Sequence, residues 1–116
     1  MTFQLFQKLM SFDTKESLCI EIFFAVKESD KFDRCWMGKM PSRETQKDIF
    51  WYGLTPDGKN AYDYPKLEDF LSADVFDGKS LTEIWNEVEI KSINGCDPSE
   101  MIEMYLSSSG GLGSPQ

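Results

Sequence analysis

Alternating apolar and polar positions predict β-strands in the first half of the chain. Between residues 18 and 26 every second side chain is a large aliphatic or aromatic one, which is the two-residue period of a strand. A polar turn at residues 28–31 is followed by a second apolar stretch, residues 32–40, which Pro41 ends. These two segments are therefore expected to pair as a hairpin.

Further strands are expected as a meander. A polar connection at residues 42–47 leads to residues 48–54, whose aromatic and β-branched content favours a third strand. The sequence Thr55-Pro56-Asp57-Gly58 is typical of a tight turn. After it, residues 59–64 fit either a short fourth strand or an extended loop.

Apolar spacing of three and four residues predicts helices on both sides of the strands. The N-terminal helix begins after Thr2 and ends near residues 12–13, with one apolar face. A short helix is expected from Pro65 to Ala73, and Ser80 to Glu83 has the pattern of a capping box that starts another helix reaching Val88. Residues 89–93 alternate as a last strand, and Asp97 caps a final helix.

These elements predict an α+β fold. We expect an antiparallel sheet of three to five strands, built from a hairpin and a meander, with an N-terminal helix and two or three C-terminal helices packed on it. A chain of 116 residues with 41% apolar composition is long enough for one core. Residues 1–106 are interpreted as a single compact domain, and the Ser- and Gly-rich residues 107–116 as a flexible tail.

The negative charge is concentrated in the second half of the chain. Residues 1–58 carry 8 Lys and Arg against 9 Asp and Glu, whereas residues 59–116 carry 4 against 11. No basic residue follows Lys91, and Asp97, Glu100 and Glu103 fall on the predicted last helix. This half is expected to repel nucleic acid and to attract cationic surfaces.

Direct nucleic-acid binding is disfavoured in the first half as well. The basic residues around the first two strands, such as Lys27, Lys39 and Lys47, are matched almost one for one by acidic ones. Such mixed charge is more typical of a solvated surface than of a track that follows phosphates.

The residue types needed for common catalytic sites are missing. The chain has no His, which excludes nucleophiles activated by His. It contains neither the Asp-x-Asp-x-Asp-Gly spacing of a calcium loop nor a glycine-rich phosphate motif, because position 73, where a Walker-type glycine is needed, is Ala73. We therefore expect no cofactor and no metal, and a non-catalytic protein.

Cellular location is expected to be cytoplasmic. The N-terminal residues do not have the basic and apolar regions of a signal peptide, and the longest apolar run, residues 22–26, is far below the ~20 residues of a membrane span. Cys19, Cys35 and Cys96 are an odd number without close spacing, so they are interpreted as reduced packing residues.

Aromatic side chains on the predicted sheet are the candidates for a binding surface. Alternation places Phe50 and Tyr52 on one face of the third strand and Ile49 and Trp51 on the other, so both faces are apolar. Either helices cover both faces or one aromatic face is left for a partner. Phe23, opposite in direction to Ile22, raises the same choice independently. The candidate protein-binding residues are Trp36, Trp51, Tyr52, Tyr62, Asp63, Tyr64, Asp97, Glu100 and Glu103.

Together these features favour a small acidic protein that binds a basic protein surface, in the manner of an inhibitor, an immunity protein or an antagonist. The alternative is a small-ligand-binding or enzymatic domain, with Tyr52, Tyr62 and a nearby Asp57 or Asp63 lining a pocket beside the sheet. A homodimer closed by the aromatic face is a third hypothesis. A deep pocket with converging polar groups favours the ligand, and a flat aromatic patch with acidic residues around it favours the protein partner.

Overall fold

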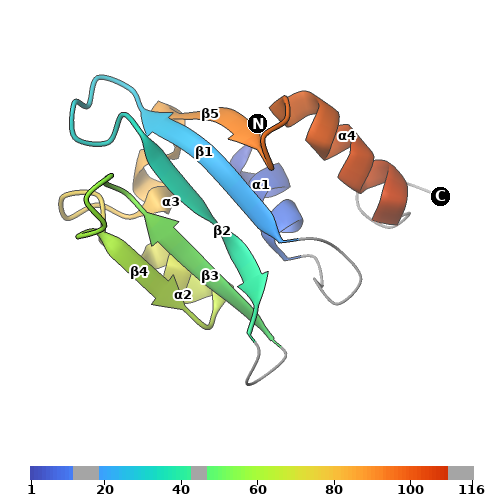
Figure 1. Ribbon diagram of the computed structural model, residues 1–116, viewed down its shortest axis with the longest axis horizontal. Coiled ribbons are helices and arrows are strands. Elements are labelled where there is room, and N and C mark those ends of the chain that lie inside the picture. Colours follow the sequence, from blue (N-terminus) through green and yellow to red (C-terminus); the bar gives the residue numbers. More distant parts are fainter. Residues whose placement is uncertain (12–18, 43–46, 110–116) are drawn as a thin grey trace.

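The computed structural model describes residues 1–11, 19–42 and 47–109 and has one antiparallel sheet of five strands (Figure 1). The strand order is β4-β3-β2-β1-β5, so the last strand in sequence lies beside the first. β4 and β5 form the two edges of the sheet. The strands are β1 (Ile20–Val26), β2 (Cys35–Pro41), β3 (Asp48–Gly53), β4 (Ala61–Tyr64) and β5 (Val88–Ile93).

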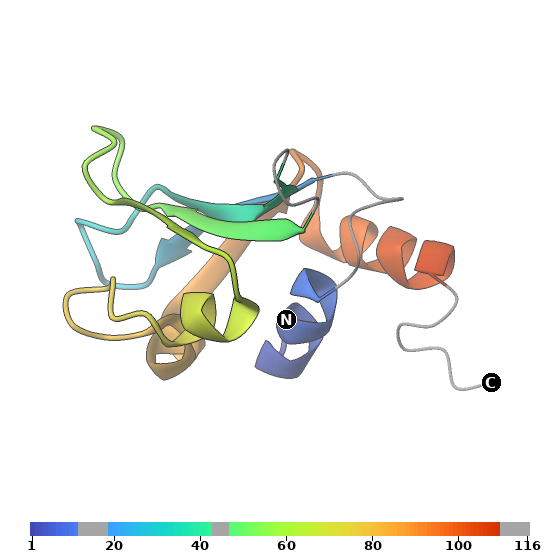
Figure 2. The same ribbon diagram turned by 90° about the horizontal axis from the view of Figure 1, so that it is seen from below.

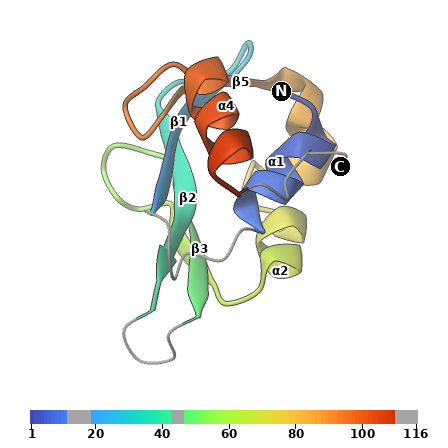
Figure 3. The ribbon, with the colours of Figure 1, turned by 90° about the vertical axis from the view of Figure 1, so that its right-hand side faces the viewer.

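Most of the described helices lie on one side of this sheet, and the last one lies beside the edge formed by β5. Figure 2 shows the sheet above the first three α-helices, and Figure 3 shows the same separation from the end of the molecule. The helices are α1 (Phe3–Met10), α2 (Leu67–Ser72), α3 (Leu81–Ile84), the 3-10 helix η1 (Trp85–Glu87) and α4 (Pro98–Ser109). The predicted α+β fold, with an antiparallel sheet, an N-terminal helix and C-terminal helices, is confirmed.

Local sequence signals start two of these helices. The Thr2 hydroxyl accepts a hydrogen bond from the Leu5 N–H, at 3.1 Å, and so caps α1. Ser80 and Glu83 form the predicted capping box: the Ser80 hydroxyl accepts from the Glu83 N–H at 3.2 Å, and the Glu83 carboxylate accepts from the Ser80 N–H at 3.0 Å. Both caps satisfy backbone donors that the first helical turn leaves unpaired.

The core lies between the helices and the sheet. Phe6 of α1 packs on Trp85, with ring centroids 4.7 Å apart, and Tyr52 of β3 stacks on Phe70 of α2 at 4.2 Å. The strands contribute Ile20, Ile22, Phe24, Met37 and Phe50. These are the alternate positions that the two-residue period assigns to one face.

Several element boundaries differ from the sequence-based expectation, among them the end of the first helix, since α1 ends at Met10 and not near residues 12–13. β2 begins at Cys35 and not at residue 32, because Phe32 ends a longer loop and inserts its ring into the core beside Phe76, 5.4 Å away. The helix predicted to reach Val88 is α3 followed by η1, and Val88 already belongs to β5. α4 extends to Ser109, three residues into the expected tail.

Some expectations concern segments outside the described residues. These are the start of the first strand at Leu18, most of the polar connection (residues 43–46) and the tail from residue 110. The undecided segment before α2 is resolved: Ala61–Tyr64 is a strand that pairs with β3. Among the described helices, none combines the length and the apolar composition that a membrane span needs.

Candidate functional site

The sheet face that points away from the helices is the candidate site. We call it the outer face; Figure 1 views the sheet from this side, with α1, α2 and α3 behind it. Because successive strand residues point to opposite faces, each buried residue is flanked by outer-face residues. The outer face consists of Glu21, Phe23 and Ala25 of β1, Trp36, Gly38 and Met40 of β2, Ile49, Trp51 and Gly53 of β3, Ala61 and Asp63 of β4, and Glu89 and Ser92 of β5.

Large apolar side chains occupy the middle of the outer face without a described helix above them. Trp36 is 42% exposed and Met40 is 45% exposed. Trp36 is paired in register with Phe23 on the neighbouring strand, and their ring centroids are 4.9 Å apart. Of the two alternatives left open by the sequence, the described residues therefore fit an uncovered aromatic face.

Two tryptophans and two glycines alternate at the centre of this face. Trp36 lies opposite Gly53, and Gly38 lies opposite Trp51, in the pairing of β2 with β3. We call these four residues the Trp/Gly square. A Cβ on Gly38 would lie 3.1 Å from Cζ2 of Trp51, so the indole lies across the glycine. The missing side chain at Gly38 gives the Trp51 ring room to lie along the sheet, whereas a Cβ on Gly53 would meet only Cβ of Trp36, at 4.0 Å.

Acidic side chains flank the square. Glu21 pairs in register with Gly38, and Asp63 pairs with Trp51, so one cross-strand row reads Glu21, Gly38, Trp51, Asp63. Both carboxylate residues are exposed. At the β5 edge, Glu89 forms an ion pair of 3.1 Å with Lys91, the extra residue of a bulge opposite β1. The row itself contains no basic residue.

The three candidate tyrosines lie on the opposite, helix-covered face. Tyr52 is 1% exposed, and its hydroxyl donates a hydrogen bond to the carbonyl oxygen of Phe70 at 2.7 Å. Burial raises the pKa of Tyr52. Tyr62 and Tyr64 are half-buried beside it. Of the aromatic candidates, only Trp36 and Trp51 therefore belong to the outer face, because strand alternation separates them from the tyrosines.

The three acidic candidates of the last helix are exposed but lie elsewhere. Asp97, Glu100 and Glu103 are at the beginning of α4, which packs next to β5, whereas Asp63 is on β4 at the opposite edge of the sheet. Hydrogen bonds from the Ser99 side chain and backbone hold the pKa of Asp97 below its ordinary value. These three carboxylates therefore form an acidic surface that is separate from Asp63.

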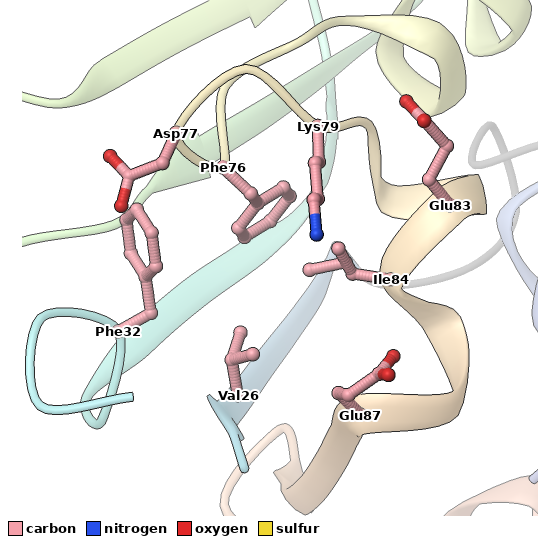
Figure 4. A pocket seen from close by; sticks show the side chains of 8 residues that line it. All are labelled: Val26, Phe32, Phe76, Asp77, Lys79, Glu83, Ile84 and Glu87. Carbon is pink, nitrogen blue, oxygen red and sulfur yellow. The ribbon is translucent and has the colours of Figure 1, made fainter. Parts of the chain in front are cut away.

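A hollow of about 290 Å³ lies at the far end of β1 and not beside the tyrosines (Figure 4). Its apolar floor is formed by Val26, Phe32, Phe76 and Ile84, and its charged residues are Asp77, Lys79, Glu83 and Glu87. Two of these carboxylates already have partners. Asp77 pairs with Lys31 at 2.7 Å, and Glu83 completes the capping box of α3.

The residues named for the ligand alternative do not converge on one side of the sheet within the described part of the chain. Tyr52 is sealed in the core, and Asp57 is in the turn after β3, where hydrogen bonds from the Thr55 hydroxyl and the Lys59 N–H lower its pKa. Asp63 points to the outer face instead. No group of three or more Cys, Asp or Glu side chains gathers for a metal ion in the described segments.

Two further sequence interpretations can be compared with the structure. Lys39, counted among the surface cations, is fully buried on the core face and pairs with Asp48 at 3.4 Å, because it follows Cys35 and Met37 in the inward alternation. Cys35 is buried as expected and donates to the carbonyl oxygen of Leu54 at 3.3 Å. Desolvation raises the pKa of its thiol to about 12, whereas Cys19 and Cys96 are exposed.

Sequence reasoning missed the residues that shape the outer face around its tryptophans. The sequence did not identify Glu21, Gly38 and Gly53 as site residues, because their role depends on which residue lies opposite each of them on the neighbouring strand. The outward alternation of Glu21 with Phe23 was the one available signal. Searches against protein-family models, curated proteins and solved structures found no match for this chain.

Proposed function

We propose that this protein is a non-catalytic module that binds a basic protein surface through its outer face. The observation that carries the proposal is the group of aromatic side chains on the outer face, which no described helix covers. Trp36 in this group is 42% exposed. Large exposed apolar patches on soluble proteins mark interaction sites, and Trp is enriched where partners bind.

The shape of this surface favours a protein over a small molecule. Small ligands are bound in concave sites that enclose most of their surface, whereas protein interfaces combine a flat apolar centre with a polar rim. The outer face is one side of a sheet, with Trp36 and Trp51 near its middle and Asp63 on an edge strand. The two tryptophans thus correspond to the apolar centre of a protein interface, and Asp63 corresponds to its polar rim.

The charge of the chain favours a cationic partner. The formal net charge is −8, and Glu21 and Asp63 place two of the carboxylates directly on the outer face. Complementary charge speeds the encounter of two proteins and selects between partners, and salt screens it over a distance of about 8 Å at physiological ionic strength. A partner with an excess of Lys and Arg on its surface meets these requirements.

Affinity capture with matched variants tests this function. The immobilised wild-type protein, Trp36→Gln and Met104→Gln are incubated with lysate of the native host, and retained proteins are identified and purified. Met104 is a matched control because it is 48% exposed but lies on α4. We expect a basic protein that is retained by the wild type and by Met104→Gln and lost by Trp36→Gln.

The salt dependence of the purified complex provides the second readout. Affinity and association rate are measured from low to physiological salt, and both are expected to fall. The proposal would be overturned by a retained partner that binds Trp36→Gln as well as the wild type, or by an affinity that salt leaves unchanged.

A further inference from the structure

The cross-strand row through the Trp/Gly square places one indole between two carboxylates. Its members, in order across four strands, are Glu21, Gly38, Trp51 and Asp63. Neighbouring strands are about 4.8 Å apart, so the backbone positions of Glu21 and Asp63 are separated by about 14 Å. Trp51 lies next to Asp63, and its ring extends across Gly38 toward Glu21. Both carboxylates therefore flank the same ring.

The indole of Trp51 meets solvent through its carbon atoms. Its Nε1 atom is buried and has no acceptor within the part of the chain that the structure describes. A hydrogen-bond donor that is turned into the protein cannot bind a partner's carbonyl or carboxylate. A partner can therefore contact the π-system of this ring, whose negative face attracts cations.

We propose that the partner of this outer face presents arginine side chains, one of which stacks its guanidinium on Trp51 and pairs with Asp63 or Glu21. This inference rests on the proposed function and specifies its chemistry. Guanidinium is planar and weakly hydrated, it stacks on aromatic faces, and it forms paired hydrogen bonds with a carboxylate. The lysine ammonium is a compact, strongly hydrated point charge and uses such a site less well.

The negative charge of the outer face disfavours nucleic acid and a second copy of this chain as binding partners. Nucleic acid would meet the two carboxylates with its own phosphates, and a second copy of this chain would bring four carboxylates together. Lys39 directly follows Gly38 on β2, but it is buried on the opposite face and pairs with Asp48. The next cations along these two strands are Arg34 and Lys47, each four residues from the row. Four strand residues span about 13 Å, so neither neutralises the row directly.

Two model peptides test the inference without a known partner. Oligoarginine and oligolysine peptides of equal length are titrated into the full chain at low salt, with calorimetry for affinity and the indole N–H resonances for location. We expect the arginine peptide to bind about tenfold more tightly, a difference of about 1.4 kcal/mol, because guanidinium stacks on an indole where both groups are partly desolvated. Asp63→Asn and Glu21→Gln should weaken both peptides several-fold, and Glu103→Gln, on α4, should not.

Variants of Trp51 separate stacking from charge. Trp51→Leu is expected to remove the preference for arginine and to leave the lysine affinity nearly unchanged. Trp51→Phe keeps an aromatic ring and should keep part of the preference, since Phe binds cations more weakly than Trp. Far-UV circular dichroism checks that each variant is folded, and the reduced preference expected for Trp51→Phe tests the stacking if Trp51→Leu does not fold.

The outcomes distinguish this inference from the function on which it rests. Equal affinity for the two peptides, or an arginine preference that survives the loss of Trp51, overturns the arginine site but leaves the binding of basic proteins intact. If neither peptide binds and sedimentation finds a dimer that Trp36→Gln dissociates, both the arginine site and the proposed function fall.

Discussion

Gly38 is the residue at which the outer face and the backbone depend most closely on each other. A Cβ at this position would overlap the carbonyl oxygen of Ile20 on β1 and would also press on the ring of Trp51. β1 and β2 could accommodate it only by moving apart. Gly53, the other glycine of the Trp/Gly square, has more room, because its added Cβ would meet Trp36 Cβ at 4.0 Å, an ordinary contact.

Gly38→Ala is therefore expected to be strongly destabilising and Gly53→Ala to be tolerated. Overpacking of this kind costs about 1–3 kcal/mol, so we expect the free energy of unfolding to fall by about 2–3 kcal/mol for Gly38→Ala. For Gly53→Ala the expected change is within about 0.5 kcal/mol. Urea unfolding followed by circular dichroism measures both. Similar values for the two variants would contradict the close approach of Gly38 to β1.

At the scale of elements, α3 depends on its cap because it is only four residues long. A helix of this length has too few internal hydrogen bonds to offset the cost of nucleation, so side chains at its start contribute much of its stability. Ser80 is 5% exposed and supplies the acceptor for the Glu83 N–H. Its removal would leave that backbone donor without its partner.

Ser80→Ala is expected to lower the free energy of unfolding by about 1 kcal/mol, as is usual for the loss of an N-cap. Ser72→Ala is the matched control, because Ser72 is exposed near the end of α2 and only donates to the carbonyl oxygen of Glu68 at 2.8 Å. We expect thermal or urea unfolding to leave that control within about 0.5 kcal/mol of the wild type. A Ser80→Ala protein as stable as the control would mean that the capping box contributes nothing.

The elements that were predictable are those whose signals are local. The capping box of Ser80 and Glu83 is contained in four residues, and the alternation of β1 is visible in seven. Burial then follows the same pattern, since Ile20, Ile22 and Phe24 lie in the core. Fold class could be inferred because it depends mainly on the kind and order of such elements.

The candidate site was only partly predictable because it depends on strand pairing. Whether Trp51 faces Gly38 or its neighbour is decided by register, and a shift of one residue would exchange the two faces of the sheet. The loop before β2 proved longer than the four-residue turn expected, so no turn type fixed that register. Likewise, nothing local to Tyr52 indicates that α2 covers its face and leaves that of Trp51 open.

For the whole molecule, charge and the exposed aromatic face act against each other. At neutral pH the formal net charge of −8 keeps copies apart, whereas near the sequence pI of about 4.4 this repulsion is lost. Near this pH, charge repulsion no longer prevents the exposed tryptophans of the outer face from driving self-association of the protein.

We accordingly expect the wild-type protein to associate most strongly between about pH 4 and pH 5. Light scattering across this range measures the effect, and Trp36→Gln should reduce it substantially. Met104→Gln, which removes an exposed apolar side chain from α4, is expected to have less influence. If both variants reduced scattering equally, general surface hydrophobicity rather than the outer face would be responsible.

The position of β5 beside β1 has a consequence for synthesis. β1 is made early, but its second neighbour, β5, follows three more described strands and three described helices. One edge of β1 therefore stays unpaired until residues 88–93 leave the ribosome. Until then, the backbone groups along this edge lack their partners, such as the Glu21 carbonyl, which accepts from the Asn94 N–H, and the Lys27 N–H, which donates to the Glu87 carbonyl. Unpaired strand edges of this kind recruit other strands. In a nascent chain of this protein, β1 therefore lacks one of its two neighbouring strands. A separate peptide with the sequence of β5 should be able to pair with this free edge of β1.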